Sequence, residues 1–226
     1  CPTDAIPSNL IIIPELCIGC GNCEAACPPA ASAIQYNHNA KELLSILPKC
    51  VEAGAESIEL HAGVPDDAST MHEWKVVSES VPNGMISMCL DRKHLSNEML
   101  IDRIKLARNI ADDRLIIQAD GIPMSGGTDD FNTTLQAVSI ADFINKEIKQ
   151  KEKIFSKLPV LISGGTNSFT GDLARKCEVP FNGITIGTHA RKVIAKFESK
   201  PHEMSNENLH KALSNAKKLI TKNLKP

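Results

Sequence analysis

The sequence has little of what nucleic-acid-binding and membrane-spanning proteins need. Its 226 residues carry a formal net charge of -2, and only 4% of them are aromatic. It therefore offers neither the basic surface nor the stacking side chains with which proteins bind nucleic acids. The longest apolar run extends from Leu10 to Ile13, far short of the roughly 20 residues that cross a bilayer. We expect neither a nucleic-acid partner nor a membrane span.

The start of the sequence lacks a methionine and a hydrophobic leader, because residue 1 is Cys1. We expect that any targeting segment was removed or lies outside this stretch. The localisation of the protein must therefore be inferred from its chemistry.

The cysteines are abundant but unevenly distributed. Of the eight cysteines, five lie within the first 27 residues. The others, Cys50, Cys89 and Cys177, stand singly in regular segments, which argues against a disulfide scaffold and favours a reducing compartment. We expect these three to be buried residues that pack as small apolar side chains.

The motif CIGCGNCEAACP, from Cys17 to Pro28, has the spacing C-x2-C-x2-C-x3-C-P. This is the spacing of bacterial ferredoxins, in which neighbouring thiolates bind a [4Fe-4S] cluster. A zinc ribbon is the alternative, but such zinc sites use two separated C-x2-C knuckles. The compact run therefore favours an iron-sulfur cluster.

The dipeptide Cys1-Pro2 has the form of the end of an earlier cysteine run. In two-cluster ferredoxins the fourth cysteine of each run binds the other cluster. By this rule Cys1 completes a four-thiolate set with Cys17, Cys20 and Cys23.

Cys27 is left over by the same rule. We expect it to bind a second cluster whose other three thiolates precede residue 1, so that the chain is the C-terminal part of a longer protein. Residues 1–36 are then a ferredoxin-like module truncated at its N-terminus, with a small hairpin between Thr3 and Leu16.

The pattern changes in residues 37–198, where short apolar segments alternate with helical periodicity. Five segments are predicted to be strands: Ser57 to Leu60, Met85 to Leu90, Leu115 to Ala119, Val160 to Ser163 and Gly183 to Ile186. A helix that crosses over between two consecutive strands lets them run parallel. The predicted fold class is therefore α/β.

The predicted helices carry recognisable end signals. Ala40 to Ala53 has helical apolar spacing and ends at Gly54, a typical C-terminal cap, and Ser96 is expected to cap the N-terminus of another helix. Leu135 to Ile148 has helical spacing too. Residues 199–226 form a tail with an amphipathic helix whose apolar positions include Leu209, Ala212, Leu213, Ala216 and Ile220.

Two architectures remain open for these units, a doubly wound sheet and a TIM-type (β/α)8 barrel. The last two predicted strands end in Gly-Gly and Gly-Thr, which favours the barrel, because its loops after strands 7 and 8 commonly bind phosphate. The five units are then strands 4 to 8, the C-terminal part of a barrel.

These two loops are also the candidate cofactor site. Backbone amides and a helix N-terminus there could hold the phosphate of flavin mononucleotide (FMN) or a similar ligand. The residues concerned are Gly164, Gly165, Asn167, Gly187, Thr188 and Arg191. The alternative is that the glycines only make tight turns between strand and helix.

His61 and Asp120 each follow a predicted strand. Both are expected at the barrel mouth, where catalytic groups collect, although a single histidine or aspartate there more often anchors a loop. The sequence therefore identifies no catalytic residue.

Four further segments, in this order after the cysteine run, resemble the light-dependent period protein A family of oxygenic phototrophs. They are IELHAG (Ile58 to Gly63), QADGIPMSGG (Gln118 to Gly127), ISGGTN (Ile162 to Asn167) and ITIGTHARKVI (Ile184 to Ile194). The resemblance covers roughly Cys1 to Ile194. It implies a two-cluster iron-sulfur protein that couples redox state to the period of the circadian clock. Family members carry a longer N-terminal region with the first cysteine run.

Three functions are consistent with these features. The first is electron transfer or redox sensing by the cluster, with the state passed to a protein partner. The second is an FMN-dependent oxidoreductase fed by the cluster, and the third is a structural cluster on a non-catalytic scaffold. Whether the chain is an enzyme stays open. The resemblance implies the plastid stroma or a cyanobacterial-type cytoplasm as the setting.

Overall fold

The structure is a computed structural model with two compact units, Cys1–Asn39 and Ala40–Pro226. It describes residues 1, 3–17, 22–28, 33–34, 40–64, 66–121, 130–195, 197 and 205–224, except the side chains of Ala25 and Asp130. The predicted divisions at residues 36 and 198 stay predictions.

In the part of the first unit that the structure describes, turns are joined by two short helices, η1 (Pro14–Leu16) and α1 (Asn22–Ala26). The predicted hairpin is a loop, in which the Ile13 amide donates to the Ala5 carbonyl at 2.9 Å. Residues 3–17 contain no strand.

The second unit is built on a parallel sheet of five strands, which confirms the α/β fold class. The strands lie in the order β1-β2-β3-β4-β5, and each pairs in parallel with the next. Their bounds are β1 Ile58–His61, β2 Ile86–Leu90, β3 Leu115–Asp120, β4 Val160–Ser163 and β5 Gly183–Ile184. All five predicted strands are present with small shifts at their ends.

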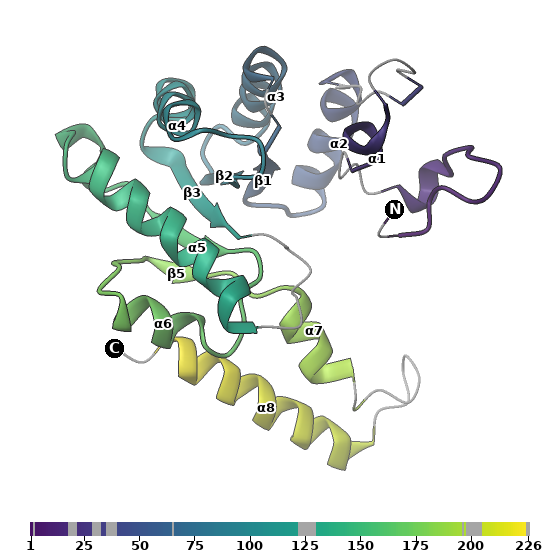
Figure 1. Cartoon of the computed structure of the whole chain (residues 1–226), viewed down its shortest axis with the longest axis vertical. Coiled ribbons are helices and arrows are strands. Elements are labelled where there is room, and N and C mark those ends of the chain that lie inside the picture. The colour runs from purple at the N-terminus through teal and green to yellow at the C-terminus, as the bar shows by residue number, and fades with distance from the viewer. Residues whose placement is uncertain are drawn as a thin grey trace. The chain divides into compact units, whose positions relative to one another are not determined.

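Helices precede, connect and follow the strands (Figure 1). They are α2 Ala40–Glu52, α3 Asp67–Ser80, α4 Asn97–Ala111, α5 Asp130–Ile144, α6 Thr170–Lys176, α7 Thr188–Ala195 and α8 Asn206–Leu224. Short helical turns lie at η2 Asp112–Arg114, η3 Asn145–Lys149 (a π-helix) and η4 Lys153–Phe155. The π-helical turn extends α5 to about the predicted end of that helix.

The helix ends follow the local signals in the sequence. The Ser96 hydroxyl accepts from the Met99 amide at 3.2 Å and so caps α4. The Gly54 amide donates to the Val51 carbonyl at 2.9 Å, with a φ of 104° at the end of α2. Asp66 caps α3 by accepting from the Ser69 amide at 3.1 Å.

The strand order distinguishes between the two predicted architectures. A doubly wound sheet reverses its strand order at a switch point, and the five described strands run in sequence without such a reversal. Sequential parallel order is the order of strands in a barrel wall. The structure therefore supports the βα-unit prediction, whereas closure into a barrel stays a prediction.

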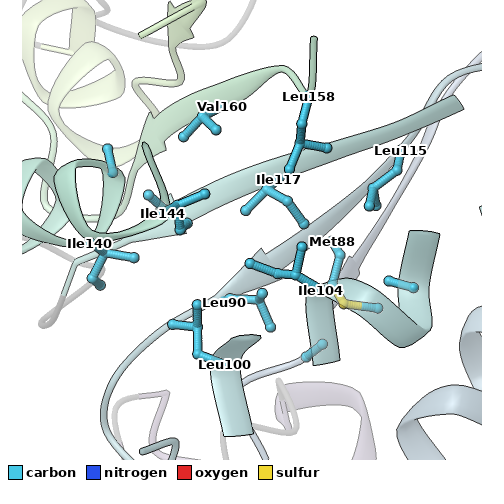
Figure 2. Close-up of a cluster of buried hydrophobic side chains, with 14 of the residues drawn as sticks. Met88, Leu90, Leu100, Ile104, Leu115, Ile117, Ile140, Ile144, Leu158 and Val160 are labelled. Carbon is cyan, nitrogen blue, oxygen red and sulfur yellow. The ribbon is translucent and has the colours of Figure 1, made fainter. Parts of the chain in front are cut away.

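The apolar core lies between one face of the sheet and the helices. Figure 2 shows Met88 and Ile117 of the sheet facing Ile104 of α4 and Ile144 of α5. These side chains are fully buried. Trp74 of α3 lies in the same core, where its indole Nε1 donates to the carbonyl of Ala107 on α4 at 3.0 Å.

The other face of the sheet carries a row of polar side chains on β1, β2 and β3. Because side chains alternate along a strand, Glu59, Ser87 and Gln118 point away from the helices and lie on neighbouring strands. The Gln118 amide donates to the Ser87 hydroxyl at 3.0 Å and to the Glu59 carboxylate. This polar face leads to the C-terminal ends of the strands.

The C-terminal helix α8 forms as predicted but presents a partly different face to the core. Its buried residues are Ala212, Leu219 and Asn223, whereas Leu213 and Ile220, predicted to face the core, are more than half exposed. The predicted face was therefore right for Ala212 and wrong for Leu213 and Ile220, because packing against α6 and α7 determines the rotation of the helix.

The prediction for the single cysteines was wrong in two of three cases. Cys50 and Cys177 are exposed, whereas Cys89 is buried. Cys50 lies on α2 and Cys177 follows α6, where helix orientation determines exposure. Among the described residues, no helix is both long and apolar enough to cross a membrane.

Candidate functional site

The first candidate site is the cysteine module of residues 1–39. The Thr3 hydroxyl lies 3.5 Å from the Cys1 Sγ and donates to the Leu16 carbonyl at 2.6 Å. Leu16 directly precedes Cys17, so Thr3 connects the first cysteine of the chain to the start of the cysteine run. The two ends of a segment of sixteen residues are thereby brought together.

The run itself flanks a single helical turn. Cys17 follows η1, Cys23 lies in the first turn of α1 and Cys27 follows that helix. Cys20 lies outside the described residues. Three residues separate Cys23 from Cys27, which is about one helical turn. The two cysteines therefore lie at opposite ends of α1.

The donor set fits an iron-sulfur cluster. Cys1, Cys17, Cys23 and Cys27 are free thiols, and each is at least partly exposed. Thiolates are the ligands of [4Fe-4S] clusters, and a disulfide between any two of these cysteines would have removed them. The described cysteines are therefore available as ligands.

The second candidate site lies at the C-terminal ends of β1, β2 and β3. His61 ends β1, Cys89 lies in β2, Asp91 follows β2 and Asp120 ends β3. The sheet register places His61 opposite Cys89, and all four side chains belong to the polar face. We call these four residues the strand-end cluster.

The four side chains of this cluster face one another closely. The His61 ring lies between two carboxylates, with Nε2 3.5 Å from the Asp91 Oδ2 and Nδ1 3.8 Å from the Asp120 Oδ2. One ligand atom each of His61, Cys89 and Asp120 lies within 4.8 Å of the others. This is a constellation of metal-ligating side chains.

Burial differs across the cluster. The side chain of His61 is 42% exposed, whereas those of Asp91 and Asp120 are 7% and 3% exposed. The Asp120 Oδ2 and the Gln118 Oε1 are buried without a hydrogen-bond partner among the described residues. An unpartnered buried carboxylate oxygen is costly.

The surroundings shift the pKa values of Asp91 and Asp120 in opposite directions. A hydrogen bond with Asp91 raises the pKa of His61, against the opposing effect of burial. Burial favours a higher pKa for Asp91, but hydrogen bonds from His61 and from the Lys93 amide outweigh it and lower the pKa. Burial raises the pKa of Asp120 and that of the Cys89 thiol. Asp91 is thus the stable carboxylate partner of His61.

Two glycines make room for these carboxylates. A β-carbon on Gly164, which follows β4, would overlap the Asp120 Oδ1 and lie 2.5 Å from the Gly121 carbonyl oxygen. A β-carbon on Gly63 would overlap the Asp91 carboxylate. Side chains at these two positions would displace the cluster.

The third candidate site consists of the loops after β4 and β5, predicted to hold a phosphate. The structure brings these loops together, because the Thr166 hydroxyl donates to the Thr185 carbonyl at 2.5 Å. Ser168 and His189 also contact each other, with 3.2 Å between the hydroxyl and Nε2.

The predicted phosphate-site residues differ in their surroundings. Gly165 has a φ of 65°, and a β-carbon there would overlap Thr133. Asn167 is buried and donates to the Gly165 carbonyl at 3.2 Å. Gly164, Gly165 and Asn167 therefore already have a structural role in the turn.

The predicted residues of the second loop are more open. Thr188 begins α7, and its hydroxyl accepts from the Arg191 guanidinium at 3.1 Å. Gly187 has free space at its β position, since the nearest atom is 3.8 Å away.

Sequence reasoning placed His61 and Asp120 at the strand ends but missed Cys89 and Asp91. Cys89 is buried, as predicted, yet its neighbours are charged. A signal was present, since position 89 has the same alternation phase as Ser87 and Asp91 in β2.

Comparison with protein families gave two matches. The family described as "Light dependent period A C-terminal domain" matches residues 50–225. The family described as "4Fe-4S dicluster domain" matches residues 9–55. No curated protein and no solved structure matched the chain.

Proposed function

The chain belongs to the light dependent period A family, and on that premise we propose that it transfers electrons or senses redox state and passes that state to a protein partner. That it is an iron-sulfur protein follows from the 4Fe-4S dicluster match over residues 9–55. A bound cluster supplies one-electron chemistry, and its potential is adjusted by hydrogen bonds and solvent exposure.

The ligand set we propose is Cys1, Cys17, Cys20 and Cys23. The observation that supports it is the position of Thr3, which contacts the Cys1 Sγ and hydrogen-bonds the carbonyl of Leu16. Cys1 is thereby held near the run rather than apart from it.

Cys27 is proposed to bind a second cluster. It lies after α1, at the opposite end of that helix from Cys23, and the match to a dicluster domain is consistent with two clusters.

A protein partner is proposed because apolar side chains in the loop between Cys1 and Cys17 are exposed. Leu10 and Ile11 are 75% and 67% exposed in the loop that connects Cys1 to Cys17. Exposed apolar groups near a redox centre suit a transient protein interface.

The test is anaerobic purification with iron and sulfide analysis and a redox titration followed by electron paramagnetic resonance. Cys17→Ser should lose iron and sulfide, whereas Cys50→Ser, which changes an exposed cysteine of α2, should retain both. Equal iron and sulfide contents in the two variants would contradict the ligand assignment. A cluster that cannot be reduced within the physiological range would favour a structural role instead.

The second candidate is an FMN-dependent oxidoreductase on a barrel. Two observations favour it, the sequential order of parallel strands and the contact between the loops after β4 and β5. In barrel enzymes these loops commonly bind phosphate. Flavin released in stoichiometric amount on denaturation would establish this function, and colourless supernatant from pure protein would exclude it.

The setting we propose is the plastid stroma or a cyanobacterial-type cytoplasm, and membership of the light dependent period A family is the support for this proposal. Fractionation of the source cells with an antibody against this chain tests it. Recovery in a secreted fraction would contradict it.

A further inference from the structure

We propose that His61, Cys89 and Asp120 bind one Zn²⁺ ion, with Asp91 as the residue that positions the His61 ring. The proposal concerns only the unit formed by Ala40–Pro226 and is independent of the iron-sulfur cluster. Four features support a divalent cation: the ligand types, their geometry, the unpartnered oxygen and the position of Asp91.

The ligand types indicate zinc rather than magnesium or calcium. Thiolate and imidazole are typical ligands of zinc, whereas Mg²⁺ and Ca²⁺ prefer oxygen ligands alone. Cys89, His61 and Asp120 offer one sulfur, one nitrogen and one oxygen atom. Zn²⁺ would be neutralised by one thiolate and one carboxylate, which suits a buried position.

The geometry needs only a small adjustment. The three ligand atoms already lie within 4.8 Å of one another. Zinc ligand bonds of about 2.0–2.3 Å require the atoms to approach somewhat further. The His61 side chain is 42% exposed, so its ring can move toward the two buried ligands.

The unpartnered oxygen is the independent indication of a ligand. Asp120 is 2% exposed, and its Oδ2 lacks a hydrogen-bond partner among the residues described. This oxygen points at His61 Nδ1, 3.8 Å away. A cation between these two atoms would satisfy the carboxylate.

Asp91 occupies the place of the carboxylate that orients a zinc-bound histidine. Its Oδ2 faces His61 Nε2 at 3.5 Å, while the other ring nitrogen faces Asp120. Metal-binding histidines usually donate their second ring N–H to a carboxylate, which fixes the tautomer. Here Asp91 would accept from Nε2 and leave the Nδ1 lone pair for the metal.

Zinc binding displaces the proton of the Cys89 thiol. The Cys89 thiol releases its proton to solvent as the sulfur–zinc bond forms, and no electron is transferred. With three protein ligands, the fourth coordination position of the zinc is left for water. Catalytic zinc sites have this arrangement.

The experiment uses the full chain, purified anaerobically with its clusters in place, and ZnCl2 as the probe. We expect one zinc ion per chain in addition to the iron. Cys89→Ser and Asp120→Asn should each weaken zinc binding at least tenfold. The matched control is Cys177→Ser, which removes an exposed thiol and should leave zinc binding unchanged.

X-ray absorption at the zinc edge identifies the ligands in the unmodified protein, so the test does not depend on the folding of any variant. One sulfur at about 2.3 Å with nitrogen and oxygen ligands at about 2.0 Å would support the site. Four sulfur ligands would assign the zinc to the cluster cysteines and overturn the proposal. Absence of zinc binding would also overturn it and would leave His61 as an ion-pair partner of the two carboxylates.

Asp91→Asn tests the positioning role. We expect zinc affinity to fall by about 10- to 100-fold, while the zinc edge still shows the same single sulfur and the same nitrogen and oxygen ligands. A changed ligand set would mean that Asp91 itself binds the metal, which contradicts this assignment.

Discussion

The guanidinium of Arg103 donates a hydrogen bond of 2.5 Å to the carbonyl of Ala62, the residue that follows His61. A second bond of 2.6 Å goes to the Val64 carbonyl, and Nε donates to the Asp67 Oδ1 at 2.8 Å. Arg103 is fully buried on α4. A helix that follows β2 therefore fixes the loop after β1 and, with it, the backbone next to His61.

Replacing Arg103 with leucine should lower the free energy of unfolding by about 3 kcal/mol, because the carbonyls of Ala62 and Val64 would lose their donors in a buried place. Denaturant unfolding followed by circular dichroism measures this. The control is Lys105→Met on the same helix, which removes an exposed pair with Glu152 and should change stability by less than about 1 kcal/mol. Equal losses in the two variants would contradict the role of Arg103.

Gly164→Ala should be strongly destabilising. Its φ is 63°, and an added methyl group would press on the Gly121 backbone and the Asp120 carboxylate. We expect a loss of about 3 kcal/mol from backbone strain and overpacking. Thermal unfolding measures the loss.

Substitutions at two other glycines distinguish the effect of backbone strain from the effect of close packing. Gly54 has a φ of 104° but open space around it, so Gly54→Ala should cost only about 1 kcal/mol of strain. Gly187→Ala meets no close atom and should be nearly neutral. If Gly187→Ala were as destabilising as Gly164→Ala, packing would not explain the effect.

Asn223→Ala should detach the end of α8 from α6. The Asn223 Oδ1 accepts from the Gly171 amide at 2.9 Å, and Nδ2 donates to the Asn167 carbonyl at 3.2 Å. Loss of these buried bonds should cost about 2 kcal/mol and increase hydrogen exchange at the Gly171 amide.

The control for Asn223 is Asn215→Ala, two turns earlier in α8 and only partly buried. It should leave exchange at Gly171 unchanged, because alanine suits a helix interior. Figure 1 shows α8 alongside α6 and α7, which is the contact that this pair of variants tests.

Thr3→Val should loosen the hold on Cys1. The substitution keeps the shape of the side chain but removes the hydroxyl that donates to the Leu16 carbonyl at 2.6 Å. A hydrogen bond of about 1 kcal/mol corresponds to roughly fivefold faster loss of iron to a chelator. Thr3→Ser keeps the hydroxyl and should lose iron at the original rate. A rate unaffected by Thr3→Val would contradict the link.

The α/β class and all five strands could be predicted because their signals are local. The strand from Val160 to Ser163 is a short apolar run before paired glycines, and Ser96 and Gly54 mark helix ends by chemistry within a few residues. The cysteine spacing is equally local, since three residues separate Cys23 from Cys27. The sequence could also place His61 and Asp120 together at one edge of the sheet. Each directly follows a predicted strand, and the C-terminal ends of parallel strands lie at the same edge.

The rest depended on contacts between distant segments. Cys89 lies in an apolar strand, and its sequence surroundings indicate only a core residue. The pairing of β1, β2 and β3 is what places it beside His61 and Asp120. The exposure of Leu213 and the burial of Asn223 depend on the rotation of α8 against α6 and α7. The sequence by itself determined the elements and the cysteine motif, since these are set by neighbours along the chain. The tertiary structure alone decided which polar side chains meet, because strand register and helix rotation result from packing across the whole unit.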